Sequence, residues 1–207
     1  MAELIDHPCV QHKLAIIRDS ETGHKRFREL ATEITMFICY EALKNLKTRE
    51  VTVTTPVADA SCRKIDTDLV VVPILRAGVG MLEGILELVP TARVGFVGLY
   101  RDEETKQPVS YYERFPPQIE GGTCIVIDPM LATGGSTVAA IDQLKKNGAE
   151  DIVVVCIVTC PEGVELVEEH HPDVRIYAAA IDDYLNENKY IVPGLGDAGD
   201  RLFGTSH

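Results

Sequence analysis

Apolar and polar residues alternate in blocks along the chain from residue 68 onward. Short runs rich in β-branched residues predict strands at residues 68–75, 93–100, 123–128, 151–158 and 174–181. Segments with helical spacing separate them, at residues 80–89, 136–148 and 161–171. The strand runs are apolar throughout, which is typical of a parallel sheet with helices on both faces. The pattern predicts an α/β fold with a doubly wound parallel sheet, which binds ligands at the carboxyl ends of its strands.

A longer amphipathic segment precedes this region, at residues 26–47. Its apolar side chains fall at helical spacing: Leu30, Ile34, Ile38 and Leu43. We expect a helix packed in the core, and a subunit interface is the alternative for its apolar face. Lys25 and Arg28 lie one turn apart and predict a solvated basic face, with an effector or phosphate site as the alternative.

Composition narrows the class of protein. A length of 207 residues without a visible linker or repeat predicts a single domain over residues 1–207. The net charge of −12 opposes non-specific binding to nucleic acid or anionic membranes, since basic surface supplies most of that affinity. The apolar runs are too short for a membrane span, and "MAELIDHPCVQHK" lacks the apolar core of a signal peptide. We therefore expect a cytoplasmic protein.

The cysteines and histidines give little sign of chemistry. The six cysteines form no C-x-x-C pair, so we expect small buried hydrophobic residues rather than a disulfide or zinc framework. The six histidines are expected to be solvated, including His170 and His171 at the end of a predicted helix. No nucleophile or general base stands out in the predicted loops.

The strongest signal is "DPMLATGGS", Asp128 to Ser136, directly after a predicted buried strand. Gly134 and Gly135 allow close backbone approach to an anion at a helix N-terminus, and Thr133 and Ser136 add hydroxyl donors. A P-loop would need a lysine that is absent here. Because Asp128 can accept hydrogen bonds from sugar hydroxyls, the segment predicts a ribose 5-phosphate site. A helix-entry cap followed by a plain turn is the alternative.

Two arginines and a long loop extend this prediction. Arg76 and Arg101 each end a predicted strand, where guanidinium groups could bind a second anionic group bidentately or simply pair with a surface acid. Residues 101–122 are polar, contain prolines and show no periodicity. A loop of that length predicts a lid that closes over a reaction needing protection from water.

These residues resemble those of the uracil phosphoribosyltransferases, over essentially the whole chain. Four stretches carry the resemblance: "KRFREL" (25–30), "PILRAGVGM" (73–81), "DPMLATGGS" (128–136) and "YIVPGLGDAGDRLFGT" (190–205). The resemblance implies the type I phosphoribosyltransferase fold with a small hood. It also implies transfer of ribose 5-phosphate from 5-phosphoribosyl 1-diphosphate (PRPP) to N1 of uracil, giving UMP and diphosphate.

The resemblance assigns roles to single residues. Its PRPP site comprises Arg76, Arg101, Asp128, Pro129, Met130, Leu131, Ala132, Thr133, Gly134, Gly135, Ser136 and Asp197. Its uracil site comprises Ile191, Gly196, Asp197 and Ala198. Its catalytic residues are Arg76, Arg101 and Asp197.

The resemblance also implies partners. Mg²⁺ normally accompanies PRPP, some family members respond to GTP, and a homodimer or homotetramer is usual. Pro129 stands where most type I phosphoribosyltransferases have a second acid, so we expect substrate oxygens and water to supply most Mg²⁺ ligands. No residue of the chain is assigned as a metal ligand.

The chemistry of residues 190–200 agrees with a base pocket. "VPGLGDAGD" is too rich in Gly and Pro for a helix or strand, so its backbone N–H and C=O groups are expected to be free. Such groups can match the imide edge of uracil, whereas cytosine would leave mispaired groups at about 1–3 kcal/mol each.

Three other functions compete with this one. A nucleotide kinase would need the missing loop lysine. A PRPP-fold regulator that senses nucleotides and binds RNA is opposed by the charge of −12. A phosphoribosyltransferase for another base is opposed by the C-terminal stretch.

Overall fold

The computed structural model describes residues 2–101 and 108–205, without the side chains of Arg101 and Pro108. The first half comprises β1 (Glu3–Leu4), α1 (Pro8–Arg18), α2 (His24–Ala42), β2 (Thr48–Thr54), β3 (Asp59–Ile65), β4 (Leu69–Leu75), α3 (Val79–Leu88), β5 (Arg93–Val94) and β6 (Phe96–Arg101). The second half comprises β7 (Pro108–Arg114), a 3-10 turn η1 (Pro117–Ile119), β8 (Thr123–Ile127), β9 (Met130–Leu131), α4 (Gly135–Lys146), β10 (Asp151–Thr159), α5 (Pro161–His170), β11 (Arg175–Ile181), β12 (Tyr184–Leu185), β13 (Ile191–Val192) and α6 (Ala198–Phe203).

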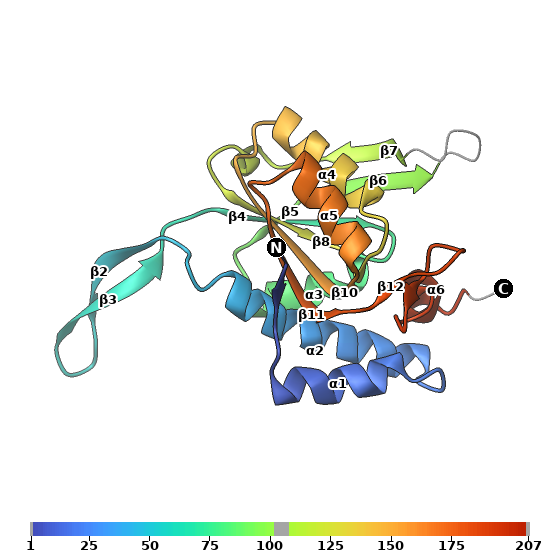
Figure 1. Ribbon diagram of the computed structural model, residues 1–207. Coiled ribbons are helices and arrows are strands. Elements are labelled where there is room, and N and C mark those ends of the chain that lie inside the picture. The colour runs from blue at the N-terminus through green and yellow to red at the C-terminus, as the bar shows by residue number, and fades with distance from the viewer. Residues whose placement is uncertain (1, 102–107, 206–207) are drawn as a thin grey trace.

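The central sheet has the predicted doubly wound form. Its strand order is β1-β11-β10-β8-β4-β6-β7, and every pair is parallel except β6 with β7. Helices α1, α2 and α3 cover one face, and α4 and α5 cover the other (Figure 1). Along β4, Val71 packs in the core between the sheet and α1, α2 and α3, whereas Val70 and Val72 pack in the core between the sheet and α4 and α5. Both faces are buried, which is why these strands are apolar throughout.

Two small units extend from this body. The hairpin of β2 and β3 projects from one side, and nearly all of its side chains are exposed (Figure 1). The short pair β12 and β13 and the helix α6 lie on the opposite side and form a small hood. No strand was predicted for the projecting hairpin, because its segments are largely polar and lack the continuous apolar runs by which the other strands were found.

Three predicted segments differ most from the structure. Helix α2 ends at Ala42 rather than at residue 47, because the chain turns there toward β2. The predicted strand at residues 93–100 is divided at Gly95 into β5 and β6. Within the predicted lid, residues 108–114 form the edge strand β7, and residues 102–107 lie outside the described part. An edge strand with polar side chains lacks the apolar pattern by which the other strands were found.

Single-residue predictions were corrected as well. His171 is buried rather than solvated; it lies 3.3 Å from the Asp142 carboxylate, and desolvation lowers the pKa of its ring. All six cysteines are free and four are buried as expected, but Cys9 and Cys62 are exposed. Across the described ranges, no helix combines the length and apolar character needed to cross a membrane.

Candidate functional site

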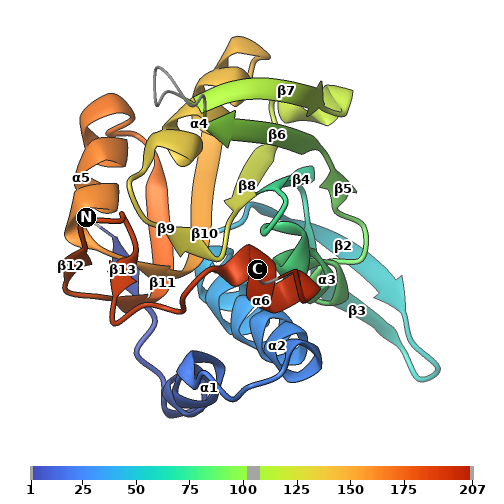
Figure 2. The ribbon, with the colours of Figure 1, turned by 90° about the vertical axis from the view of Figure 1, so that its right-hand side faces the viewer.

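The predicted site residues gather at the carboxyl edge of the sheet. Strand β4 lies between β8 and β6, with Pro73 opposite Ile127 and Leu75 opposite Gly98. The loops after these neighbouring parallel strands therefore meet at one edge. The hood covers the same edge, where α6 packs on α2 and α3 (Figure 2).

Residues 128–136, which we call the phosphate loop, have the geometry of an anion site. Gly134 has a φ of +81° and is the N-cap residue of α4, which begins at Gly135, one residue before the predicted start. The Val138 N–H donates to the Gly134 carbonyl (2.9 Å), so the N–H groups of residues 135–137 precede the helical hydrogen-bond ladder. These groups and the helix dipole both favour a phosphate at this position.

The end of β10 and the start of α5 pack behind this loop and hold it. Thr159 Oγ1 donates to the Leu131 carbonyl (2.9 Å), and Cys160 Sγ donates to the Ala132 carbonyl (3.4 Å). A Cβ at Gly163 would lie 2.4 Å from the Ala132 carbonyl oxygen, so only glycine allows this close approach. The contacts of Thr159, Cys160 and Gly163 could not be predicted from the sequence. These residues lie about 30 positions from the loop, in a segment whose pattern predicts only a strand and a helix.

Asp128 directly follows β8 and is half-buried, and its carboxylate accepts a hydrogen bond from the Met130 N–H (3.5 Å). Burial raises the pKa of this carboxyl to about 7, and the backbone hydrogen bond opposes the rise only in part. The group therefore retains its proton to a higher pH than an ordinary aspartate, and hydroxyl donors or positive charge from a ligand would favour the carboxylate.

Arg76 is exposed at the end of β4. Its guanidinium group lies 6.0 Å from the centre of the Phe203 ring and 3.8 Å from Asp200 Oδ1, so its contact with a surface acid is loose. Arg101 ends the neighbouring strand β6, and its side chain lies outside the described part of the molecule. Arg76 can thus face an anion at the same edge as the phosphate loop.

The C-terminal stretch is more regular than predicted. Ile191 is buried in β13, and α6 starts at Ala198, so the expectation of neither strand nor helix was wrong at both ends. Asp197 caps α6 by accepting a hydrogen bond from the Asp200 N–H (2.9 Å). The irregular backbone is therefore confined to residues 193–197, between β13 and α6, and Gly196 within it has a φ of +72°. We call residues 191–198 the base loop.

The hood brings the base loop to Arg76. A Cβ at Gly199 would lie 3.2 Å from Asp197 Oδ1 and 3.9 Å from Arg76 Nη2, so both charged groups border this glycine. The structure thereby joins residues more than 100 positions apart in the sequence.

Two further arginines hold the hood to the body. Arg201 donates to the carbonyls of Leu195 (3.0 Å) and Asp19, and its guanidinium group stacks 4.4 Å from the Phe27 ring. Arg28 is exposed, as predicted for a solvated basic face, and it also donates to the Leu202 carbonyl (2.7 Å). These contacts could not be predicted from the sequence, because their acceptors are main-chain carbonyl groups, which every residue has.

Comparison with known proteins agrees with this arrangement. A family model described as uracil phosphoribosyltransferase matches residues 4–205. A curated protein of that name from Halalkalibacterium halodurans is 59% identical over 203 residues, covering 98% of this chain and 97% of its own. The solved structure of the AQ2163 protein from Aquifex aeolicus is 38% identical, with a TM-score of 0.94 over 100% of this chain and 99% of that chain.

A more distant structure shares the fold alone. It is a hypoxanthine phosphoribosyltransferase from Staphylococcus aureus, 12% identical, with a TM-score of 0.53 over 87% of this chain and 84% of its own. The family model, in contrast, spans the phosphate loop, both strand-end arginines and the base loop. Together with the 59% identity of the curated relative, that match shows that this chain belongs to the uracil phosphoribosyltransferase family.

Proposed function

We propose that this protein transfers the ribose 5-phosphate group of PRPP to N1 of uracil, giving UMP and diphosphate. One observation carries the proposal: an open helix N-terminus with a carboxylate beside it lies at the same sheet edge as a glycine-rich loop with fixed main-chain groups. The first two features suit a ribose 5-phosphate and the third suits a planar base. The family relationship supplies the identity of that base.

The PRPP half of the site uses the phosphate loop. The N–H groups of residues 135–137 and the hydroxyls of Thr133 and Ser136 would bind the 5-phosphate, and Asp128 would accept hydrogen bonds from the ribose hydroxyls. Residues 129–132 hold the backbone of this loop against β10, where β9 pairs. Arg76 and Arg101 would bind the diphosphate.

The uracil half of the site uses the base loop. Ile191 supplies buried apolar surface, and the backbone between Gly196 and Ala198 offers N–H and C=O groups for the imide edge of the base. A pocket that reads a base through main-chain groups is selective only if the backbone is held still.

The reaction breaks the bond from C1′ of the ribose to the diphosphate oxygen and forms a bond from C1′ to N1 of uracil, which loses its proton. Arg76 and Arg101 would stabilise the charge that develops on the diphosphate. Asp197, beside Arg76, would orient the base or offset positive charge on the ribosyl group. Positioning of both substrates does the remaining work, since N1 of uracil is itself the nucleophile and none is needed from the protein.

The donor set fits a Mg²⁺ ion that arrives with PRPP. The described residues contain no group of three or more acidic, His or Cys side chains placed to hold a metal. Mg²⁺ retains several waters and needs only one or two carboxylates besides substrate phosphates, so Asp128 and the diphosphate would suffice. The bound ion would neutralise charge on the leaving diphosphate.

Two further properties stay predictions of the family relationship: activation by GTP and a homodimeric or homotetrameric state. Size-exclusion chromatography with light scattering tests the second. Initial rates of UMP formation with and without GTP, at PRPP concentrations below saturation, test the first.

The deciding experiment measures nucleotide formation from PRPP and Mg²⁺ with uracil, cytosine, adenine and hypoxanthine in parallel. We expect turnover with uracil alone. Turnover with another base would retain the PRPP site and refute the assignment of the base loop. If the protein binds PRPP but makes no nucleotide with any base, the proposed reaction is wrong.

A further inference from the structure

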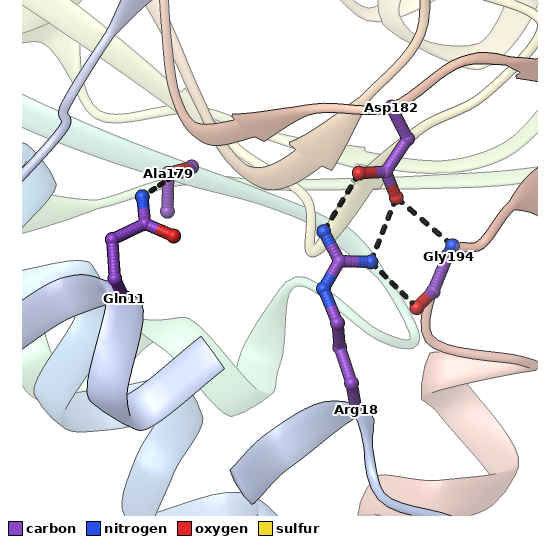
Figure 3. A network of polar contacts seen from close by, with 5 residues as sticks. All are labelled: Gln11, Arg18, Ala179, Asp182 and Gly194. Atoms are coloured by element: carbon purple, nitrogen blue, oxygen red, sulfur yellow. Dashed lines mark hydrogen bonds and ion pairs between the residues drawn. The ribbon is translucent and has the colours of Figure 1, made fainter. Parts of the chain in front are cut away.

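An ion pair ties the first helix to the strand end beside the base loop. Arg18 is the last residue of α1, and Asp182 directly follows β11. The guanidinium group donates to both carboxylate oxygens, from Nη1 to Oδ2 (2.8 Å) and from Nη2 to Oδ1 (2.7 Å) (Figure 3). The Asp182 side chain is only 6% exposed and that of Arg18 25% exposed, so the pair is largely withdrawn from water.

Both members of this pair also hold Gly194, in the middle of the base loop. Arg18 Nη1 donates to the Gly194 carbonyl (2.9 Å), and the Gly194 N–H donates to Asp182 Oδ2 (2.9 Å) (Figure 3). The two main-chain polar groups of Gly194 are thus fixed by two opposite charges. Gly194 has a φ of +63°, and a Cβ there would lie 2.1 Å from the Ile191 carbonyl oxygen, so the loop depends on glycine at this point.

The pair connects this loop to the sheet. The Asp182 N–H donates to the Thr159 carbonyl at the end of β10 (2.7 Å), which fixes Asp182 relative to β10 and β11. The next N–H, of Asp183, donates to the Val192 carbonyl (3.0 Å). On the other side, Gln11 Nε2 contacts the Ala179 carbonyl of β11 (3.5 Å), so α1 meets that strand at two points (Figure 3).

We propose that Arg18 and Asp182 are positioning residues for base recognition, an inference that rests on the proposed function. They set the main-chain groups of the base loop at the spacing that accepts uracil and excludes cytosine. A desolvated ion pair contributes little net stability, because removing two charges from water offsets their attraction. A bidentate Arg–carboxylate pair does, however, define distance and orientation, which is what recognition by main-chain groups requires.

The competing explanation is that the pair only fastens α1 to the sheet. A fastening role would lower thermal stability and the fraction of folded enzyme, but would leave the KM for uracil and the ratio of uracil to cytosine turnover unchanged. The two explanations therefore differ in a kinetic readout that a folding defect does not move.

The test uses Arg18→Lys, Arg18→Met and Asp182→Asn in the full chain. Matched controls are Lys13→Met and Glu33→Gln, which break another ion pair of α1, one that includes no residue of the base loop. We expect Arg18→Met and Asp182→Asn to raise the KM for uracil about tenfold or more, since each leaves a buried polar group mispaired. The KM for PRPP should stay within about twofold of the wild-type value. Arg18→Lys keeps the charge but loses the bidentate guanidinium group, so its KM for uracil should lie between those of the wild type and Arg18→Met.

A second measurement does not depend on turnover. Hydrogen exchange of residues 190–197 should quicken in Arg18→Met and Asp182→Asn and stay unchanged in the two control variants. The inference is overturned if folded Arg18→Met and Asp182→Asn keep the wild-type KM for uracil, or if both KM values rise equally. A wild-type protein that makes no UMP refutes the proposed function instead, and with it the role in base recognition.

Discussion

Replacing Asp128 with Asn should make the protein more stable and less active. Burial raises the pKa of this carboxyl from an ordinary value of 3.8 to about 7. At about 1.4 kcal/mol per pH unit, ionisation of the buried group costs folding about 4 kcal/mol. A neutral amide of the same shape avoids that cost and can still accept the hydrogen bond from the Met130 N–H.

The raised pKa of Asp128 determines the pH range in which the variant is more stable than the wild type. Below pH 3.8 the wild-type carboxyl is protonated in both states, so the two proteins should be equally stable. Between pH 3.8 and about 7 the wild type loses stability, because only its unfolded state ionises freely. The advantage of the variant should therefore be smaller at pH 5 than at pH 8, where it should reach about 4 kcal/mol.

The assay is urea unfolding without Mg²⁺ or PRPP, at pH 5 and pH 8 and at one protein concentration. Asp173→Asn is the control of opposite sign: Asp173 is hydrogen-bonded to Lys145, which lowers the pKa of the carboxyl, so its loss should reduce stability at pH 8. The reasoning about Asp128 is refuted if its variant is less stable at pH 8, or if its advantage is the same at both pH values. Turnover should fall about a hundredfold, since a positioned ribose contact is lost.

Other substitutions test the remaining parts of the site. Gly163→Ala should raise the KM for PRPP at least tenfold and leave that for uracil unchanged, because the new methyl group would displace the Ala132 carbonyl; unchanged PRPP kinetics would show that the phosphate loop tolerates this shift. Arg101→Ala should lower kcat about a hundredfold, and a near-normal rate would remove Arg101 from the mechanism. Gly194→Ala should raise the KM for uracil at least tenfold, because it combines a positive φ with a clash against Ile191; normal kinetics in the folded variant would contradict the geometry of the base loop.

Elements with a local apolar pattern could be predicted from the sequence, and elements without one could not. The strands near residues 68, 123, 151 and 174 were found because burial on both faces of the sheet imposes a simple apolar pattern, and the helices near residues 80, 136 and 161 because of their helical spacing. The hairpin of β2 and β3 and the edge strand β7 were missed because pairing, not burial, makes them strands. The end of α2 was misplaced because its last turn is decided by the path of the chain, not by its apolar spacing.

The amino-acid sequence by itself determined the sheet, its two covered faces and the phosphate loop, since each is written in a contiguous stretch. The prediction that Asp128 and the glycines after it bind a sugar phosphate rests on the same contiguous stretch. Only the tertiary structure decided what supports these residues. Gly163 behind the phosphate loop, and Arg18 with Asp182 behind the base loop, act through main-chain carbonyl and N–H groups that every residue carries. Such contacts leave no local pattern in the sequence, and they exist only once strands and helices from distant parts of the chain have packed.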